Sequence, residues 1–239
     1  MRQLFKQAAL KLAAKAKMLP YGVDFAADLR RRYPCLTIGT IFDVGANIGQ
    51  AAEMFLSRYP RASVHSFEPD PKTFAKLVSR TEGRLTAHNL ALSDAPGRMR
   101  FDDTLRSSEM HAIAKDQSDA SLPLVDVTTV DLFCRTRGIG KIDLLKLDTE
   151  GNELKVLEGA AGMIAGDRIP SIMVECSLSY GEHAGLIPFR IMQERMDRLG
   201  YVCLGIYHQS PHWLDPSTAE IQFANCVFVS RHMGQPSPP

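Results

Sequence analysis

The sequence predicts an α/β fold with a doubly wound, mostly parallel sheet of seven strands. From residue 37 onward, short apolar runs alternate with segments of helical periodicity, as in parallel sheets whose crossovers are helices. The runs IDLL (142–145) and SIMV (171–174) are nearly continuously apolar, which favours strands buried on both faces. A glycine-punctuated turn, FDVGANIG (42–49), stands where the first strand meets its helix.

Seven segments have the composition of strands, and four segments between them have helical spacing. The expected strands are 37–44, 62–69, 84–92, 141–151, 169–176, 201–207 and 224–230. The expected helices are 47–59, 70–81, 152–164 and 187–200. The first helix carries apolar residues at Ile48 and Phe55. Asp70 and Pro71 are a typical cap and first position for the second helix, and Gly200 is a typical stop for the last.

One stretch departs from this alternation. Residues 97–103 have the pattern of a short strand, and residues 104–124 have the composition of a polar loop. A loop of that length inside a compact domain is usually functional or disordered. Its Arg106, Ser107, Ser108 and His111 offer hydrogen bonds suited to a polyhydroxyl ligand. A disordered surface loop is the alternative.

The chain is expected to form one domain over 37–232, because no Gly/Ser-rich or Pro-rich stretch interrupts its middle. Residues 1–36 are expected to form an N-terminal helical extension, and residues 233–239 a disordered tail. Within the extension, residues 1–18 have an amphipathic helical pattern with a basic polar face. Such a helix either packs on the domain as a lid or makes weak peripheral contact with a membrane surface.

The composition argues against several classes of protein. The 28 lysines and arginines balance 27 aspartates and glutamates, so the net charge of +1 offers no general attraction to nucleic acid. Five cysteines, an odd number without close pairing, argue against a disulfide framework and against a zinc site. The sequence has no apolar run near the roughly 20 residues of a membrane span and no secretory signal pattern. These features favour a cytoplasmic protein.

The glycine turn is the first candidate binding site. Gly45 can adopt backbone angles denied to other residues, and Gly49 lets the following helix pack closely. Glu68 ends the second strand, 19 positions after Gly49, which matches the spacing at which an acidic residue binds ribose hydroxyls. Adjacent parallel strands end side by side, so we expect Glu68 to flank the turn and to accept hydrogen bonds from a ribose diol.

The identity of the turn residues favours S-adenosylmethionine over a dinucleotide. A pyrophosphate requires the G-x-G-x-x-G pattern, and Asn47 stands where its second glycine would be. Asn47 and Asp43 would crowd and repel a pyrophosphate, whereas Asp43 would attract the ammonium of an amino acid. We therefore expect Asp43, Gly45, Asn47 and Gly49 to hold the methionine part of the cofactor, and Glu68 its ribose. A nicotinamide-dependent oxidoreductase is the alternative.

Several stretches resemble the FkbM family of S-adenosylmethionine-dependent methyltransferases, which have the Rossmann-like class I fold. They are IFDVGANIGQ, VHSFEPDPKTFAKL, HNLALSD, VDVTTVDLF and IDLLKLDTEGNELKVLEGA, within residues 37–176. The resemblance implies an O-methyltransferase, of a kind that often acts on sugars or glycosylated natural products. It also implies that Leu92, Ser93 and Asp94 lie near the adenine, although Asp94 alternatively belongs to the turn before Pro96.

The candidate catalytic residues follow the fourth and fifth strands. Lys146 and Asp148 are two apart on one strand and therefore share a face. They either form an ion pair or face the crevice, with Asp148 near the sulfonium and the acceptor oxygen. Glu175 ends the neighbouring strand, and His183 follows in the next loop. Trp213, in the last polar loop, is expected to serve packing, with stacking on a sugar as the alternative.

Methyl transfer to oxygen requires a positioned hydroxyl that loses its proton. The candidate bases are Asp148, Glu175 and His183, and the histidine has the most suitable ordinary pKa. A divalent metal bridging Asp148 and Glu175 would be another way to acidify the hydroxyl. No histidine–carboxylate cluster with metal-ligand spacing is present in the sequence, so no metal site is predicted.

Two questions stay open at this stage. A non-catalytic binding module that kept the cofactor pocket is an alternative to an enzyme, although the Lys146–Asp148 pair argues against it. The acceptor is expected to be a small molecule or a sugar hydroxyl rather than nucleic acid, because the motif of amino-methylating DNA enzymes is absent and the charge is balanced. The sequence identifies neither the acceptor nor the oligomeric state.

Overall fold

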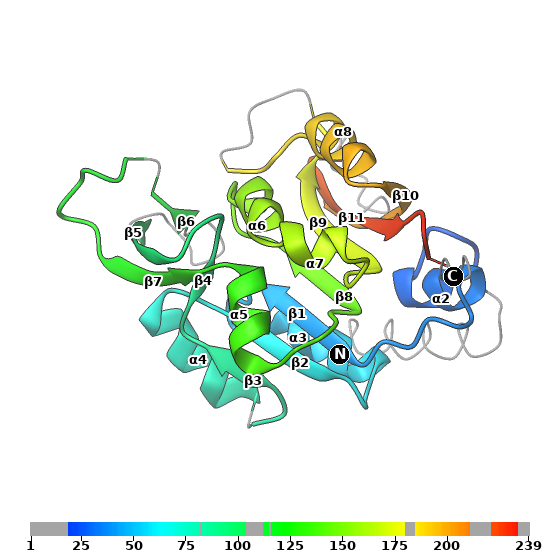
Figure 1. Cartoon of the computed structure of the whole chain (residues 1–239), viewed down its shortest axis with the longest axis horizontal. Helices are drawn as coiled ribbons and strands as arrows, with labels where there is room; N and C mark the ends of the chain where they lie inside the picture. Colours follow the sequence, from blue (N-terminus) through cyan, green and yellow to red (C-terminus); the bar gives the residue numbers. More distant parts are fainter. Residues whose placement is uncertain are drawn as a thin grey trace.

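The computed structural model describes residues 19–81, 83–103, 112–114, 116–179, 185–210 and 221–233. These residues form a central sheet between layers of helices, with a smaller sheet at one end (Figure 1). The expected helix over 1–18 and nearly all of the expected tail lie outside the described residues. His183, Trp213 and the polar residues at 106–108 and 111 also lie outside them.

The central sheet has seven strands in the order β10-β11-β9-β8-β1-β2-β3. They are Thr40–Val44 (β1), Ser63–Phe67 (β2), Thr86–His88 (β3), Leu144–Leu147 (β8), Ser171–Ser177 (β9), Tyr201–Ser210 (β10) and Phe223–Ser230 (β11). The pairs β1–β2, β2–β3, β1–β8 and β8–β9 are parallel, and β11 is antiparallel to both of its neighbours. The predicted doubly wound, mostly parallel, seven-stranded sheet is confirmed.

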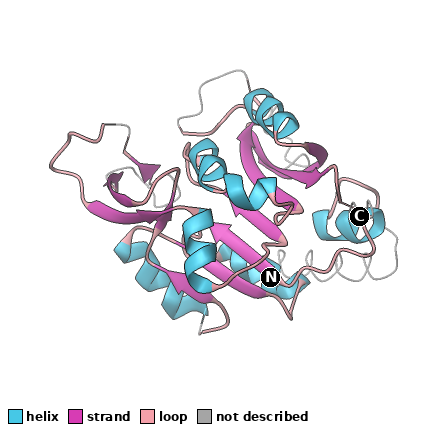
Figure 2. Ribbon diagram, in the orientation of Figure 1, coloured by secondary structure: helices cyan, strands magenta, loops and turns pink. Residues whose placement is uncertain are grey.

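Helices cover both faces of this sheet (Figure 2). The described helices are Phe25–Arg32 (α2), Gln50–Arg58 (α3), Pro71–Thr81 (α4), Val130–Arg137 (α5), Glu153–Gly159 (α6), Ala161–Ala165 (α7) and Phe189–Arg198 (α8). Residues of α2 and α3 share one buried cluster with Ile41, and residues of α5 to α8 share another with Phe42. These consecutive β1 residues point to opposite faces, so the sheet is buried on both sides.

The helix expected over 152–164 is instead two helices, α6 and α7, which meet at Ala160. The junction lies where another part of the chain comes close. A Cβ on Gly159 would lie 2.0 Å from the carbonyl oxygen of Ser93, so only a glycine allows this approach. The contact brings the end of α6 and the segment after Leu92 together.

The third strand was predicted to run unbroken over 84–92, and this prediction is wrong. β3 ends at His88, and Ala91–Leu92 (β4) leaves the central sheet to pair with another strand. Asn89 causes the turn: its side-chain amide donates to the carbonyl oxygens of Glu68 and Pro69, at 2.9 Å each. These bonds hold the chain over the end of β2 and direct β4 away from the sheet.

A second, four-stranded sheet in the order β4-β7-β5-β6 was not predicted. Its other strands are Gly97–Asp102 (β5), Ala112–Ile113 (β6) and Leu124–Thr128 (β7), so the expected polar loop over 104–124 contains β6 and reaches β7. Helix α5, also missed, follows directly. Its two ends carry residue types that are typical of helix caps, Thr129 and Gly138. In the structure the Thr129 side chain accepts from the Leu132 amide at 3.0 Å, and Gly138 ends the helix.

Within the described part of the chain, none of the helices is both long and apolar enough to cross a membrane.

Candidate active site

A cavity that is open to solvent lies at the carboxyl ends of β1, β2 and β8. The strand order reverses there, because the chain adds β2 and β3 on one side of β1 and β8 on the other. Ligands bind at such switch points in open α/β sheets. The described lining is Val44, Gly45, Phe67, Glu68, Pro69, Leu90, Ala91, Leu92, Phe101, Ala112, Ile113, Asp148, Thr149 and Asn152. Two of these residues are charged, and both are acidic.

Gly45 forms the tip of β1 and lines the cavity. Its amide and that of Ala46 both donate to the carbonyl oxygen of Phe67, at 3.1 and 3.0 Å. Its φ of +77° is in the left-handed region, and an added Cβ would lie 1.7 Å from the carbonyl oxygen of Asp148. The turn therefore fits between its neighbouring strands only with glycine at this position.

Gly49 allows the close helix packing that the sequence predicted, but it does not line the cavity. It begins α3 with a φ of +93°, and it is not part of the cavity lining. An added Cβ would lie 2.9 Å from the Leu77 side chain and 3.1 Å from that of Thr81. Gly49 thus lets the start of α3 approach α4 closely.

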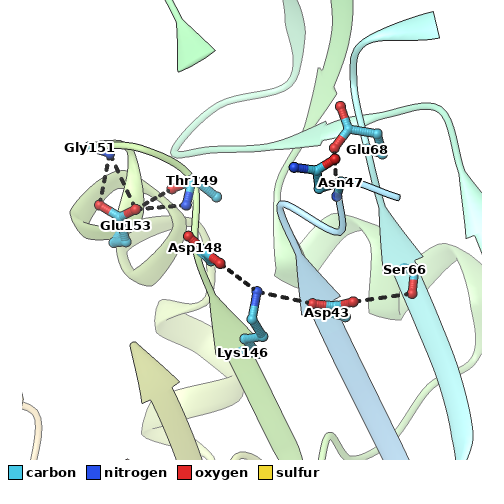
Figure 3. Close-up of polar contacts among 9 residues, drawn as sticks. All are labelled: Asp43, Asn47, Ser66, Glu68, Lys146, Asp148, Thr149, Gly151 and Glu153. Carbon is cyan, nitrogen blue, oxygen red and sulfur yellow. Dashed lines mark hydrogen bonds and ion pairs between the residues drawn. The ribbon is translucent and has the colours of Figure 1, made fainter. Parts of the chain in front are cut away.

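Two backbone amides fix Glu68 in the cavity lining. Figure 3 shows the one from Asn47. One carboxylate oxygen accepts from the Asn47 amide and the other from the Asp70 amide, both at 2.9 Å. The residue is 6% exposed, and burial raises the pKa of its carboxyl group to about 7, although the two hydrogen bonds oppose this shift. The backbone of Asn47, with a φ of +47°, is what positions the carboxylate.

Asp43, Lys146 and Asp148 form a chain of charges behind and beside the cavity, continued by Ser66 (Figure 3). The Lys146 ammonium lies 3.3 Å from an Asp43 oxygen and 3.0 Å from an Asp148 oxygen, and the Ser66 hydroxyl donates to Asp43 at 3.5 Å. Asp43 is 0% and Lys146 5% exposed, whereas Asp148 lines the cavity. Both predicted arrangements therefore occur together: the ion pair forms, and Asp148 faces the crevice.

The titration of these groups reflects the same geometry. Burial raises the pKa of Asp43, and the Lys146 ammonium opposes the shift. Burial alone would lower the pKa of Lys146, but Asp148 and Asp43 outweigh burial and raise it. Lys146 is therefore held in its charged form. Because Asp43 is fully buried against Lys146, it lies behind the cavity and not in its lining.

Leu92 lines the cavity, as expected for a residue near an adenine, but the two residues that follow it, Ser93 and Asp94, do not. Ser93 is buried, and its hydroxyl donates to Asp94 at 2.9 Å and to Asn152 at 3.3 Å. Asp94 is exposed. Asn152, which lines the cavity, donates to the carbonyl oxygen of Leu92 at 2.9 Å and so joins β4 to the start of α6.

Glu153 holds the loop between β8 and α6 in place (Figure 3). Its carboxylate accepts from the amide and the hydroxyl of Thr149, at 2.7 and 2.9 Å, and from the amide of Gly151, at 3.2 and 3.1 Å. Glu153 is fully buried, and Glu150 and Gly151 have φ values of +55° and +106°. Left-handed backbone angles at non-glycine residues are strained and persist only where the surrounding structure holds them. The hydrogen bonds to Glu153 hold this loop and so help to place Asp148 and Glu150.

Three carboxylates meet at the end of β8 and β9. Leu147 pairs with Val174, so the next residues, Asp148 and Glu175, lie side by side. One carboxylate oxygen from each of Asp148, Glu150 and Glu175 lies within 4.8 Å of the others. Burial, and then the neighbouring Asp148, raise the pKa of Glu175 to about 8.

The comparison with protein families decides which family carries this site. The family model described as the methyltransferase FkbM domain matches residues 43–203, more than half of the chain. The chain belongs to the FkbM methyltransferase family.

Individual proteins named as methyltransferases are also similar to this chain. The 2-O-methyltransferase NoeI of Sinorhizobium fredii is 28% identical, over 50% of this chain and 56% of that protein. The hexuronic acid methyltransferase AglP of Haloferax volcanii is 27% identical, over 62% of this chain and 57% of that protein. The chain thus spans a little over half the length of these two relatives. Among solved structures, fibrillarin of Aeropyrum pernix is a distant likeness, with 14% identity and a TM-score of 0.43 over 82% of this chain and 68% of that chain.

Within this FkbM-family domain, the structure brings part of the predicted site together. The predicted residues in the cavity lining are Gly45, Glu68, Leu92 and Asp148. Those outside the lining are Asp43, Asn47, Gly49, Ser93, Asp94, Lys146 and Glu175, of which Lys146 and Glu175 adjoin Asp148. Sequence reasoning missed Asn152 and Glu153 in the FkbM stretch NELKVLEG. The spacing of Thr149 and Glu153, close to that of a capping box, was the one available indication.

Proposed function

We propose that this chain is an S-adenosylmethionine-dependent O-methyltransferase that methylates a hydroxyl of a sugar or another small molecule. Membership of the FkbM family supports the activity. The named activities of the similar proteins, a 2-O-methyltransferase and a hexuronic acid methyltransferase, support the class of acceptor. A cytoplasmic location and the absence of a nucleic-acid acceptor remain proposals from the composition.

The observation that carries this proposal is the charge of the cavity. Among the described lining residues, the charged ones are Glu68 and Asp148, both carboxylates. A cofactor with a sulfonium and an ammonium is attracted by such a lining, whereas the diphosphate of a nicotinamide dinucleotide is repelled. Asn47 and the acidic cavity together speak against the oxidoreductase alternative.

The residues present fit S-adenosylmethionine. When bound, this cofactor supplies a methyl group on a positive sulfur, and transfer to a hydroxyl oxygen forms a C–O bond, breaks the C–S bond and releases a proton. Glu68 would accept from the ribose hydroxyls, because its carboxylate is already oriented by two amides. Leu92 and Asn152 would flank the adenine, and Gly45 the amino-acid part.

The acceptor hydroxyl would lie against Asp148 and Glu175, beyond the carboxyl ends of β8 and β9. Lys146 holds one oxygen of Asp148, so the side chain keeps a fixed orientation. Holding the acceptor hydroxyl in line with the methyl group can supply at best about 7–11 kcal/mol of the barrier. The carboxylates at this end of the cavity would take the proton from the hydroxyl, and His183 stays a further candidate base outside the described residues.

Binding and turnover test the proposal separately. Calorimetry should detect S-adenosylmethionine and S-adenosylhomocysteine but not NAD. A screen of sugar nucleotides, glycans and hydroxy acids with labelled methyl donor should give a product heavier by one methyl group. Asp148→Ala should abolish that product while cofactor binding remains, and Asp126→Ala, an exposed residue of β7, should not.

The outcomes separate the candidate functions. Binding of NAD in place of S-adenosylmethionine would favour the oxidoreductase. Cofactor binding without transfer to any acceptor would favour a non-catalytic binding module. Unchanged turnover in Asp148→Ala would remove Asp148 from the mechanism.

A further inference from the structure

We propose that Asp148, Glu150 and Glu175 bind one divalent cation of the Mg²⁺ or Mn²⁺ kind at the acceptor end of the cavity. The inference extends the proposed function, and rests on it, in assigning the cation the task of holding the acceptor hydroxyl. The cation site itself stands on side chains that the structure describes.

The geometry of the three carboxylates is the first support. One oxygen from each lies within 4.8 Å of the other two, and they come from the end of β8, the following loop and β9. Two of the three are fixed by their surroundings. Lys146 holds one oxygen of Asp148 at 3.0 Å, and Glu153 fixes the loop that carries Glu150.

A buried hydroxyl next to the cluster is the second, independent support. Ser177 is 3% exposed, and within the described part of the chain its hydroxyl oxygen has no hydrogen-bond partner. Ser177 lies two residues after Glu175 on β9, so both side chains leave the same face of the sheet at the same edge. A buried hydroxyl without a partner destabilises the fold, and a cation or its bound water would remove that penalty.

A neighbouring amide oxygen is in the same situation. Asn225 stands directly opposite Glu175 across the β9–β11 pair, so the two side chains share a face. The side-chain oxygen of Asn225 is buried and also has no partner among the described residues. On the sheet face that carries Glu175, Ser177 and Asn225 thus each have a buried oxygen that lacks a hydrogen-bond partner among the described residues.

The donor chemistry indicates the kind of cation. Carboxylate, hydroxyl and amide oxygens are hard ligands, which suit Mg²⁺ and Mn²⁺ and do not suit soft metals. Three carboxylates this close repel one another unless protons or a cation lie between them. A cation at this place would stabilise negative charge on an acceptor oxygen as its proton leaves.

Manganese binding to the full chain tests the inference. Mn²⁺ titrations, followed by calorimetry and by the loss of the free-Mn²⁺ electron paramagnetic resonance signal, should show one saturable site in the wild type. Glu150→Gln and Glu175→Gln should each weaken it by about tenfold or more, because a ligand charge is lost. Glu194→Gln, an exposed residue of α8 that pairs with Arg190, is the matched control and should bind as the wild type does.

Two results would overturn the inference. One is no saturable Mn²⁺ site in the wild type, and the other is equal Mn²⁺ affinity in all three variants. Unchanged circular dichroism and S-adenosylhomocysteine affinity in Glu150→Gln and Glu175→Gln would exclude misfolding as the cause of a loss. Full methyl transfer in EDTA would refute the cation's task of holding the acceptor hydroxyl and would leave the proposed function standing. Mn²⁺ binding without cofactor binding would refute the proposed function and leave the cation site.

Discussion

Replacement of Glu68 by Gln separates the stability of this fold from its proposed ligand. The substitution keeps the shape of the side chain and removes a negative charge that is 6% exposed. Burial raises the pKa of Glu68 from its ordinary 4.5 to about 7. At about 1.4 kcal/mol per pH unit, that difference corresponds to roughly 3 kcal/mol.

The sign of the effect follows from the direction of the shift. A carboxyl group whose pKa is raised by folding contributes stability that is present below its unfolded pKa and is lost as pH rises through its folded pKa. For Glu68 the loss falls between about pH 4.5 and 7. The glutamine cannot ionise, so from pH 5 to pH 9 the variant should gain roughly 2–3 kcal/mol in unfolding free energy relative to the wild type.

Cofactor affinity should move in the opposite direction. Loss of charge-assisted hydrogen bonds to a ribose diol costs about 1.5–3 kcal/mol, which corresponds to roughly 10- to 150-fold in the Kd of S-adenosylhomocysteine. In the wild type the Kd should rise as pH falls below about 7, because protonated Glu68 accepts poorly from the diol. In Glu68→Gln this rise should be absent.

Urea denaturation from pH 5 to pH 9 and calorimetry with S-adenosylhomocysteine from pH 5.5 to pH 8.5 measure the two effects. Glu53→Gln, which removes a partly exposed carboxylate paired with Arg80 on α4, is the control and should show neither. An unchanged Kd in Glu68→Gln, or parallel stability curves for the variant and the wild type, would refute the reasoning.

Three further substitutions test the positions around this carboxylate. Gly45→Ala should destabilise the protein by about 3 kcal/mol or more in thermal or urea unfolding, because its φ is +77° and the new Cβ would meet the carbonyl oxygen of Asp148; wild-type stability would contradict the close packing of the turn. Lys146→Met should lower the unfolding free energy by about 3–5 kcal/mol, because Asp43 is left buried without its cation. Adding Asp43→Asn should restore part of that loss, and purely additive effects in the double variant would show that the pair does not interact. Glu153→Gln should lower turnover more than S-adenosylhomocysteine affinity, since it frees the loop after Asp148; equal losses in both would argue against a positioning role.

The parts of the site that could be predicted are those set by local pattern and parallel-strand geometry. The spacing of Glu68 from the glycine turn placed it beside Gly45, because neighbouring parallel strands end at one edge of the sheet. The two-residue separation of Lys146 and Asp148 likewise predicted their common face, and the structure shows their ion pair. These inferences use only strand period and strand direction.

The parts that could not be predicted depend on contacts between distant segments. Nothing in the run 84–92 shows that the Asn89 amide will bond to the end of β2 and turn the chain away. The full burial of Asp43 is likewise decided by Lys146, which lies far along the chain. Asn152 looks like an ordinary helix cap in the sequence, yet its side chain bonds to the Leu92 carbonyl 60 positions away.

A crystal structure of the chain with S-adenosylhomocysteine tests the central claim most directly. We expect the ligand in the cavity beyond β1, β2 and β8, with its ribose hydroxyls within hydrogen-bonding distance of the Glu68 carboxylate. A complex in which the nucleoside lies elsewhere, or in which Glu68 contacts no hydroxyl of the ribose, would contradict it.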